Sequence, residues 1–93
     1  MAKRRKVKAR QMSKYDPLKI HLIDSQEMVV TLSFAQIERI LDTDLPQSAF
    51  RHNAWWANET EGTHTHSNSW MDAGYRTENV NLNSTTVTFR KSN

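Results

Sequence analysis

The sequence predicts a small α+β domain in which a three-stranded sheet is covered by three to four short helices. Three short β-branched or alternating segments predict the strands, at residues 28–32, 76–82 and 85–90. The last two flank a turn at Asn83 and Ser84, which indicates a hairpin. Helical patterns fill the space between the first strand and this hairpin, and strands grouped in this way are typical of α+β domains.

The first element is a short helix predicted over residues 17–24. Asp16 can cap this helix, and Pro17 suits its first turn because proline has no N–H to leave unpaired there. The apolar residues recur about one turn apart, which predicts one buried face. Leu18 and Leu22 are expected to lie on that face, with Ile23 as a third candidate.

The strand at 28–32 leads into the clearest helical signal of the chain. Ser33 and Gln36 match the capping box, and Leu32 with Ile37 match the hydrophobic staple that accompanies it. We therefore expect a helix from residue 33 or 34 to about 41. Its apolar face consists of Phe34, Ile37, Ile40 and Leu41. The expected neighbours of this face in the core are Leu22, Val30, Leu82, Val87 and Phe89.

Two further helices are predicted before the hairpin. Residues 42–44, two Asp and one Thr, end the preceding helix, and the next one runs over about 46–54. A polar loop at 57–64 separates it from a turn-rich helix over 66–73. Gly74 ends that last helix, because glycine most readily adopts the left-handed conformation found at helix C-termini.

Composition places the chain in the class of small proteins with a single domain. Its 93 residues contain no cysteine, which excludes disulfides and thiolate metal sites. No apolar run approaches the roughly 18 residues of a membrane span, and no apolar stretch follows the basic start as in a signal peptide. We therefore expect a cytoplasmic protein that does not contact a membrane.

The charge is distributed very unevenly along the chain. Residues 15–93 carry six Lys or Arg against ten Asp or Glu, a net charge of about −4, although the whole chain is +3. The first 14 residues carry seven cations and no acid: Lys3, Arg4, Arg5, Lys6, Lys8, Arg10 and Lys14. Residues 1–13 are expected to form a disordered basic tail attached to a domain over 14–93, because like charges with few apolar residues cannot pack.

The natural partner of such a tail is a polyanion, because each phosphate that it neutralises releases condensed counterions. The alternatives are a tail that serves only solubility, or a sequence with no partner. The run from Lys3 to Lys8 also matches a nuclear import signal, but nothing else in the chain indicates a eukaryotic host.

A second unusual region lies between Leu45 and Tyr75, which holds all three tryptophans and three of the four histidines. Aromatic faces beside hydrogen-bonding and cationic groups are typical of sites that hold a nucleobase. The residues expected to form this surface are Arg51, His52, Trp55, Trp56, Asn58, His64 and Trp70. The alternative is that Trp55 or Trp56 is a core residue and the other packs under the 57–64 loop.

The predicted helix at 46–54 would bring parts of this surface together. Arg51 and Trp55, and likewise His52 and Trp56, are four residues apart and would share a helical face. An arginine over an aromatic ring is a usable contact for a base or phosphate, and equally a common stabilising pair.

Catalytic and metal chemistry receive little support. His52, His64 and His66 match no standard zinc spacing, and no cysteine or well-placed carboxylate completes a set. Ser48 lies one turn before His52, but no acidic partner or oxyanion loop is recognisable. We therefore expect no catalytic residues, no metal and no cofactor.

From Tyr15 to Arg90 the chain resembles an uncharacterised family of small bacterial and phage domains. The likeness covers nearly the whole body and leaves out the basic extension before Lys14. The matching segments are 14–18, 30–34 with Ile37-Glu38, Leu45-Pro46 with Ser48-Ala49, Trp55-Trp56 with Asn58, His64, Trp70, 73–75 and 87–90. His66 departs from the pattern, because a Gln is expected two residues after the family histidine. The resemblance implies a recognition module more than an enzyme.

The sequence therefore favours a small non-enzymatic nucleic-acid-binding protein, whose tail contacts phosphates and whose Trp/Arg/His/Asn surface contacts bases. It does not distinguish DNA from RNA or predict an oligomeric state. The alternative is a protein-interaction module in which tryptophan and arginine form the centre of an interface with a partner protein.

Overall fold

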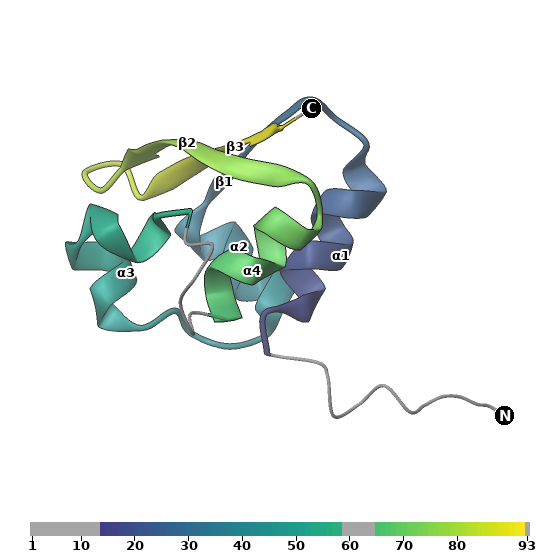
Figure 1. The fold of residues 1–93 in the computed structure, drawn as a ribbon. Helices are drawn as coiled ribbons and strands as arrows, with labels where there is room; N and C mark the ends of the chain where they lie inside the picture. The colour runs from purple at the N-terminus through teal and green to yellow at the C-terminus, as the bar shows by residue number, and fades with distance from the viewer. Residues whose placement is uncertain (1–13, 59–64, 93) are drawn as a thin grey trace, which may run out of the picture.

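The structure is a computed structural model that describes residues 14–58 and 65–92. The tail at 1–13, most of the loop predicted at 57–64, and His64 lie outside the described residues. A three-stranded antiparallel sheet has helices packed against one face (Figure 1), which confirms the predicted α+β class. The elements in chain order are α1 (Asp16–Ser25), β1 (Val29–Ser33), α2 (Phe34–Leu41), α3 (Gln47–Arg51), the 3₁₀ helix η3 (Asn53–Trp56), α4 (Thr65–Asp72), β2 (Tyr75–Asn81) and β3 (Thr86–Lys91).

Helix α1 follows the sequence prediction with two exceptions, its cap and Ile23. Leu18 and Leu22 are buried, as expected, and Pro17 lies in the first turn after a cap at Tyr15 rather than Asp16. The third candidate, Ile23, is 48% exposed, so that part of the prediction was wrong. Adjacent residues of a helix point about 100° apart, and α1 packs on α2 and α4 through the face that carries its leucines.

Helix α2 begins where the capping signal predicts. The backbone N–H of Gln36 donates to the Ser33 hydroxyl at 3.0 Å, and the Ser33 N–H donates to Oε1 of Gln36 at 2.8 Å. Phe34, Ile37 and Leu41 are buried, whereas Ile40 is only partly buried at the edge of the core. The helix ends at Asp42, whose φ of 59° is left-handed.

The helix predicted over 46–54 forms only in its first part, at Gln47–Arg51, and its continuation to 54 is wrong. Helix α3 ends at Arg51, His52 is extended with φ −132° and ψ 120°, and the chain turns again in η3. Arg51 and Trp55 therefore do not share a helical face, and neither do His52 and Trp56. The bend lets the indole N–H of Trp56 donate to the Ala49 carbonyl at 3.0 Å, a bond that a straight helix would not form.

The sheet order is β1-β3-β2, with β3 in the centre and antiparallel to both neighbours. The predicted hairpin is confirmed, with a turn at 82–85 and strand ends that differ from the prediction by about one residue. The register of β2 shifts between Thr77 and Asn79, which marks a bulge. Gly74 has a φ of 90°, as its predicted place at the end of α4 requires.

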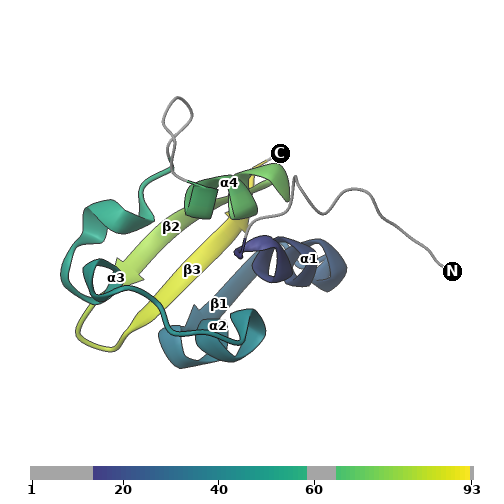
Figure 2. The ribbon, with the colours of Figure 1, turned by 90° about the horizontal axis from the view of Figure 1, so that it is seen from below.

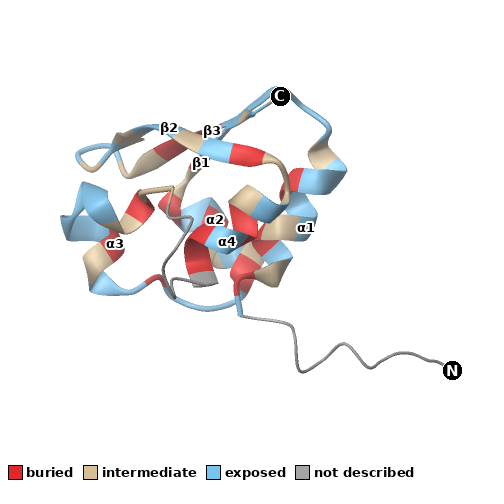
Figure 3. Ribbon diagram, viewed as in Figure 1, coloured by how far each residue is buried: buried red, intermediate tan, exposed pale blue. Residues whose placement is uncertain are grey.

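The core lies between the sheet and the helical layer. Seen from below, α1, α2 and α4 lie across one face of the strands (Figure 2). Buried positions, red in Figure 3, occur both in the strands and in these helices. Val87 and Phe89 of β3 are fully buried, as predicted. Val30 and Leu82 are only partly buried and pack against this core from its margin. None of the helices within the described ranges is long and apolar enough to span a bilayer.

Candidate nucleic-acid interface

The three tryptophans do not share one environment. Trp56 is 1% exposed and Trp70 is 0% exposed, whereas Trp55 is partly exposed. The Trp56 ring stacks between Phe34, at a centroid distance of 4.8 Å, and Trp70, at 5.8 Å. Trp56 and Trp70 therefore have no ring face for a base, so the sequence expectation that they form a stacking surface must be corrected. They are core residues.

Asn58 is also committed to the fold. Its Oδ1 accepts from the indole N–H of Trp70 at 2.9 Å and from the backbone N–H of Thr77 at 2.9 Å. The Thr77 hydroxyl donates to the same oxygen at 3.1 Å, and the Asn58 Nδ2 donates to the Thr77 carbonyl at 3.2 Å. The amide thus links the segment after η3 to α4 and β2. It is not available to a ligand, which corrects its expected role.

Replacing Asn58 with Ala should destabilise the domain by about 2–3 kcal/mol, because the indole N–H of Trp70 and the N–H of Thr77 lose their acceptor. Urea denaturation would measure the change in the free energy of unfolding. Asn68→Ala is the matched control, since Asn68 is exposed on α4 and should show almost no effect. Equal effects of the two substitutions would contradict the structural role of Asn58.

Trp55 also belongs to a group of aromatic rings that includes Tyr15, near the start of the described residues. Its ring stacks on His66 with centroids 4.0 Å apart and an interplanar angle of 5°, and the Trp55 carbonyl lies 2.8 Å from the His66 ring nitrogen Nε2. Tyr15 meets Trp55 edge-on at 6.2 Å and His66 at 5.8 Å. Burial raises the pKa of Tyr15 above its usual value. This group, defined by Tyr15, Trp55 and His66, is called the Trp55 group below.

Lys14 connects the Trp55 group to the basic tail. Its Nζ lies 5.5 Å from the centroid of the Tyr15 ring, and its side chain is exposed. Chain connectivity therefore places the attachment point of residues 1–13 beside the Trp55 group. Sequence reasoning did not include Tyr15 or His66 among the site residues. The departure of His66 from the family pattern was the available signal, because a histidine can both stack on Trp55 and bond its carbonyl.

The other predicted site residues are not brought together. Arg51 and His52 are exposed, and neither makes a side-chain hydrogen bond or ion pair with the described residues. His64 and the six tail cations lie outside the described part of the chain. In the ranges that the structure describes, no three His, Asp or Glu side chains gather as metal ligands would.

A separate polar face is formed by the outer side of the sheet, away from the helices. Arg90 forms an ion pair with Glu78 at 3.0 Å, and Arg76 lies opposite Arg90 in the β2–β3 register. Thr31 and Thr88 face each other across β1 and β3 with their hydroxyls 2.9 Å apart. Figure 1 shows that the sheet and the start of α1 lie on different sides of the molecule, so this face is remote from the start of α1.

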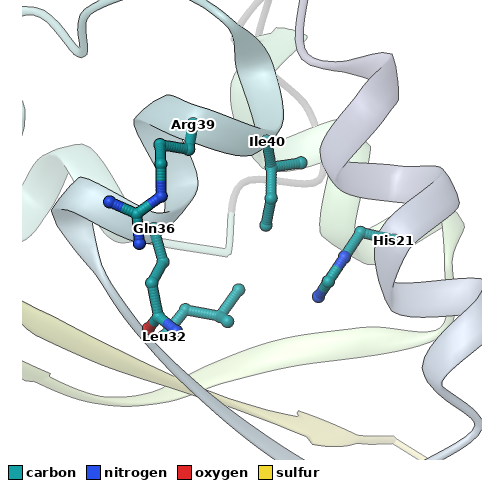
Figure 4. A pocket seen from close by; sticks show the side chains of 5 residues that line it. All are labelled: His21, Leu32, Gln36, Arg39 and Ile40. Atoms are coloured by element: carbon teal, nitrogen blue, oxygen red, sulfur yellow. The ribbon is translucent and has the colours of Figure 1, made fainter.

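An open cleft of about 330 Å³ lies beside β1, between α1 and α2. Leu32 and Ile40 form its apolar part, and His21 and Arg39 lie at its rim with Gln36 (Figure 4). No carboxylate lines this cleft, and Arg39 has no ion-pair partner among the described residues. Its lining holds neither a pair of carboxylates nor a nucleophile beside a base.

Comparison with known proteins places the chain in a family. Residues 15–92 match the model of a family described as Domain of unknown function (DUF7662). The chain belongs to this family. Neither the curated proteins nor the solved structures gave a match. The DUF7662 match begins at Tyr15, so the family domain includes the Trp55 group and leaves out the basic tail, as the resemblance in the sequence implied.

The structure gives a physical reason for the WW-x-N motif of this chain. In the segment from Trp55 to Asn58, one tryptophan enters the core, the other joins the Trp55 group, and the asparagine binds Trp70 and Thr77. The motif therefore builds the fold around η3. What it leaves at the surface is part of the Trp55 ring.

Proposed function

We propose that this DUF7662 protein is a small, non-enzymatic nucleic-acid-binding protein of bacterial or phage cytoplasm. The basic tail contacts phosphates, and the exposed part of Trp55 contacts a base where the tail joins the domain. The observation that carries this proposal is the position of Lys14, the cation that directly follows the tail, over the Tyr15 ring in the Trp55 group.

The charge distribution supports a local contact at the tail. Residues 15–93 have a net charge of about −4, so the domain as a whole repels a polyanion. The seven cations of residues 1–14 attract one, and no acidic residue lies among them. Phosphate contacts of this kind supply affinity that is independent of base sequence and falls with salt. A nucleic acid held by the tail is thereby kept next to its attachment point.

Trp55 supports a contact with a base at that point. It is the only tryptophan of the three with a partly exposed side chain, and all three are described. His66 stacks on one face of its ring and Trp56 meets it in a T-shaped contact at 4.7 Å, so a base would contact the exposed remainder. Stacking on an aromatic side chain contributes about 1–3 kcal/mol per base and does not depend on the base sequence. The phosphate contacts of the tail do not depend on it either, so the two contacts are compatible.

Tryptophan fluorescence tests this proposal directly. Adding a single-stranded oligonucleotide to the intact protein should quench the emission of Trp55, whereas Trp56 and Trp70 remain as a constant buried background. The Trp55→Phe variant should still bind, yet should show no fluorescence change. Binding is followed separately by the anisotropy of a labelled oligonucleotide, with single- and double-stranded DNA and RNA at two salt concentrations.

The panel separates the two parts of the proposal. Binding without quenching would leave the tail as the nucleic-acid contact and remove Trp55 from the interface. An absence of binding to all four nucleic acids at low salt would contradict the proposed function. Arg76→Gln on the remote sheet face is the matched charge control, and it should change neither the quenching nor the affinity by more than about twofold.

A further inference from the structure

The two edges of the sheet differ in how their backbone groups are satisfied. In an antiparallel sheet, alternate residues of an edge strand direct their N–H and C=O away from the neighbouring strand. On β2, Thr77 directs both groups outward, and both are bonded by the side chain of Asn58. The amide occupies the place of a neighbouring strand. This edge is therefore closed at its centre.

The edge formed by β1 is open. The Lys91 N–H donates to the Met28 carbonyl and the Phe34 N–H donates to the Thr85 carbonyl, each at 2.8 Å, so even-numbered residues of β1 face β3. The odd-numbered residues face outward. Gln36 bonds the outward N–H of Ser33, whereas the N–H and C=O groups of Val29 and Thr31 have no partner among the described residues.

Exposed apolar side chains gather in the chain segment that leads into this edge. Five large hydrophobic residues of the described chain are exposed, and four of them lie between residues 20 and 29. These four are Ile20, Ile23, Met28 and Val29, and the fifth is Phe50 on α3. The cleft lined by Leu32 and Ile40 lies on the helix side of the same edge. A strand added to β1 would cover both features.

We infer that β1 pairs with β1 of a second copy of this chain. The pairing is antiparallel and two-fold symmetric, with Val29 opposite Thr31 of the second copy and Val30 opposite its own equivalent. In this register each free N–H of one copy donates to a free C=O of the other, and the Ser33 N–H stays on Gln36. The two sheets join into one.

The same register places side chains in complementary surroundings. Even-numbered residues of β1 point toward the helices, so Met28 of the second copy comes to lie beside Leu32, over the cleft that Ile40 and His21 also line. Met28 is 58% exposed in the single chain and adapts readily to an irregular apolar cleft.

The distribution of charge around β1 favours a second copy of this chain as the partner of the open edge. Glu27 of one copy lies opposite Ser33 of the other, where α2 begins with Gln36 and Arg39 on its exposed side. Two acidic residues, Asp24 and Glu27, precede β1 in the chain. In the pair they lie near the exposed Arg39 of the other copy, which has no ion-pair partner among the described residues of its own chain. Two-fold symmetry forms this contact twice.

A disulfide tests the register, because the chain contains no cysteine of its own. Full-length Val30→Cys should form a covalent dimer under mild oxidation, since directly opposed residues of this kind have Cα atoms about 4.5 Å apart. Asn81→Cys on the opposite edge is the matched control and should cross-link at least about tenfold more slowly. Equal rates for the two variants would overturn the proposed pairing.

Sedimentation equilibrium of the unmodified chain gives the second readout. The chain should show a concentration-dependent dimer, and Met28→Glu or Thr31→Pro should raise its dissociation constant about tenfold or more. Among the backbone groups, proline removes only the outward N–H of residue 31. It also removes the Thr31 hydroxyl that bonds Thr88, so circular dichroism checks that the fold is retained. Phe50→Gln, the exposed apolar residue away from β1, should leave the dimer unchanged. A monomer at all concentrations, a dimer that ignores the β1 variants, or a monomer that binds an unrelated extended peptide on β1 would each overturn the inference.

Discussion

Replacing Trp70 with Ala should destabilise the domain by about 3–5 kcal/mol, the largest stability effect that we expect from a single substitution. Trp70 is completely buried. Its ring stacks on Trp56 and packs at a tilt against Phe89, and its indole N–H donates to Asn58. Small domains are stable by only about 5–15 kcal/mol, so this loss would leave little margin. Equilibrium unfolding in urea, followed by circular dichroism, measures it.

Two other substitutions make this experiment specific. Trp70→Phe retains most of the ring but loses the hydrogen bond to Asn58, so it should cost less than the change to Ala. Trp55→Ala should also cost less, because Trp55 is already partly exposed. If Trp55→Ala destabilised the domain more than Trp70→Ala, the division into a core tryptophan and a surface tryptophan would be incorrect.

The second large effect concerns the tail. Deleting residues 1–13 removes six of the seven cations that precede the domain and should weaken nucleic-acid binding on the order of a hundredfold at low salt. The melting temperature should change by no more than a few degrees, because the six like charges of the segment oppose its packing. Oligonucleotide anisotropy and thermal unfolding measure the two quantities on the same preparations.

A full-length variant with the six tail cations replaced by Gln distinguishes charge from length. It should lose as much affinity as the deletion, because the phosphate contacts depend on charge. If both variants bound as tightly as the unmodified chain, the tail would serve only solubility. If the deletion unfolded the domain, the boundary at residue 14 would be misplaced.

The elements that could be predicted from the sequence are those whose signals are local. The start of α2 follows from Ser33 and Gln36, which are close enough in the chain to bond each other wherever the helix packs. The hairpin and the end of α4 at Gly74 are likewise set by short segments with special backbone preferences. These features required no knowledge of the core.

The errors occur where tertiary contacts override local preference. A continuous helix over 46–54 is broken at His52, because the bend lets Trp56 enter the core and bond the Ala49 carbonyl. No local sequence pattern predicts this break in the helix. The composition of the aromatic region predicted a surface, whereas two of its three tryptophans are the largest fully buried side chains of the core.

Asn58 shows why residue type alone does not define a site. Its amide would serve a ligand well, yet all of its hydrogen bonds described here go to Trp70 and Thr77, residues more than ten positions away in the chain. Only the fold brings these partners together. The Trp55 group is the converse case. The sequence did not assign Tyr15 or His66 to a site, yet both contact Trp55 although they are distant from it along the chain.

The salt dependence of nucleic-acid affinity tests the central claim most directly. For the intact chain, the logarithm of the association constant should fall linearly with the logarithm of salt concentration. The slope should be negative, with a magnitude of about 4–6, as expected when most of the seven cations each neutralise one phosphate. A slope near zero, or no measurable affinity at low salt, would contradict a protein that holds nucleic acid by its basic tail.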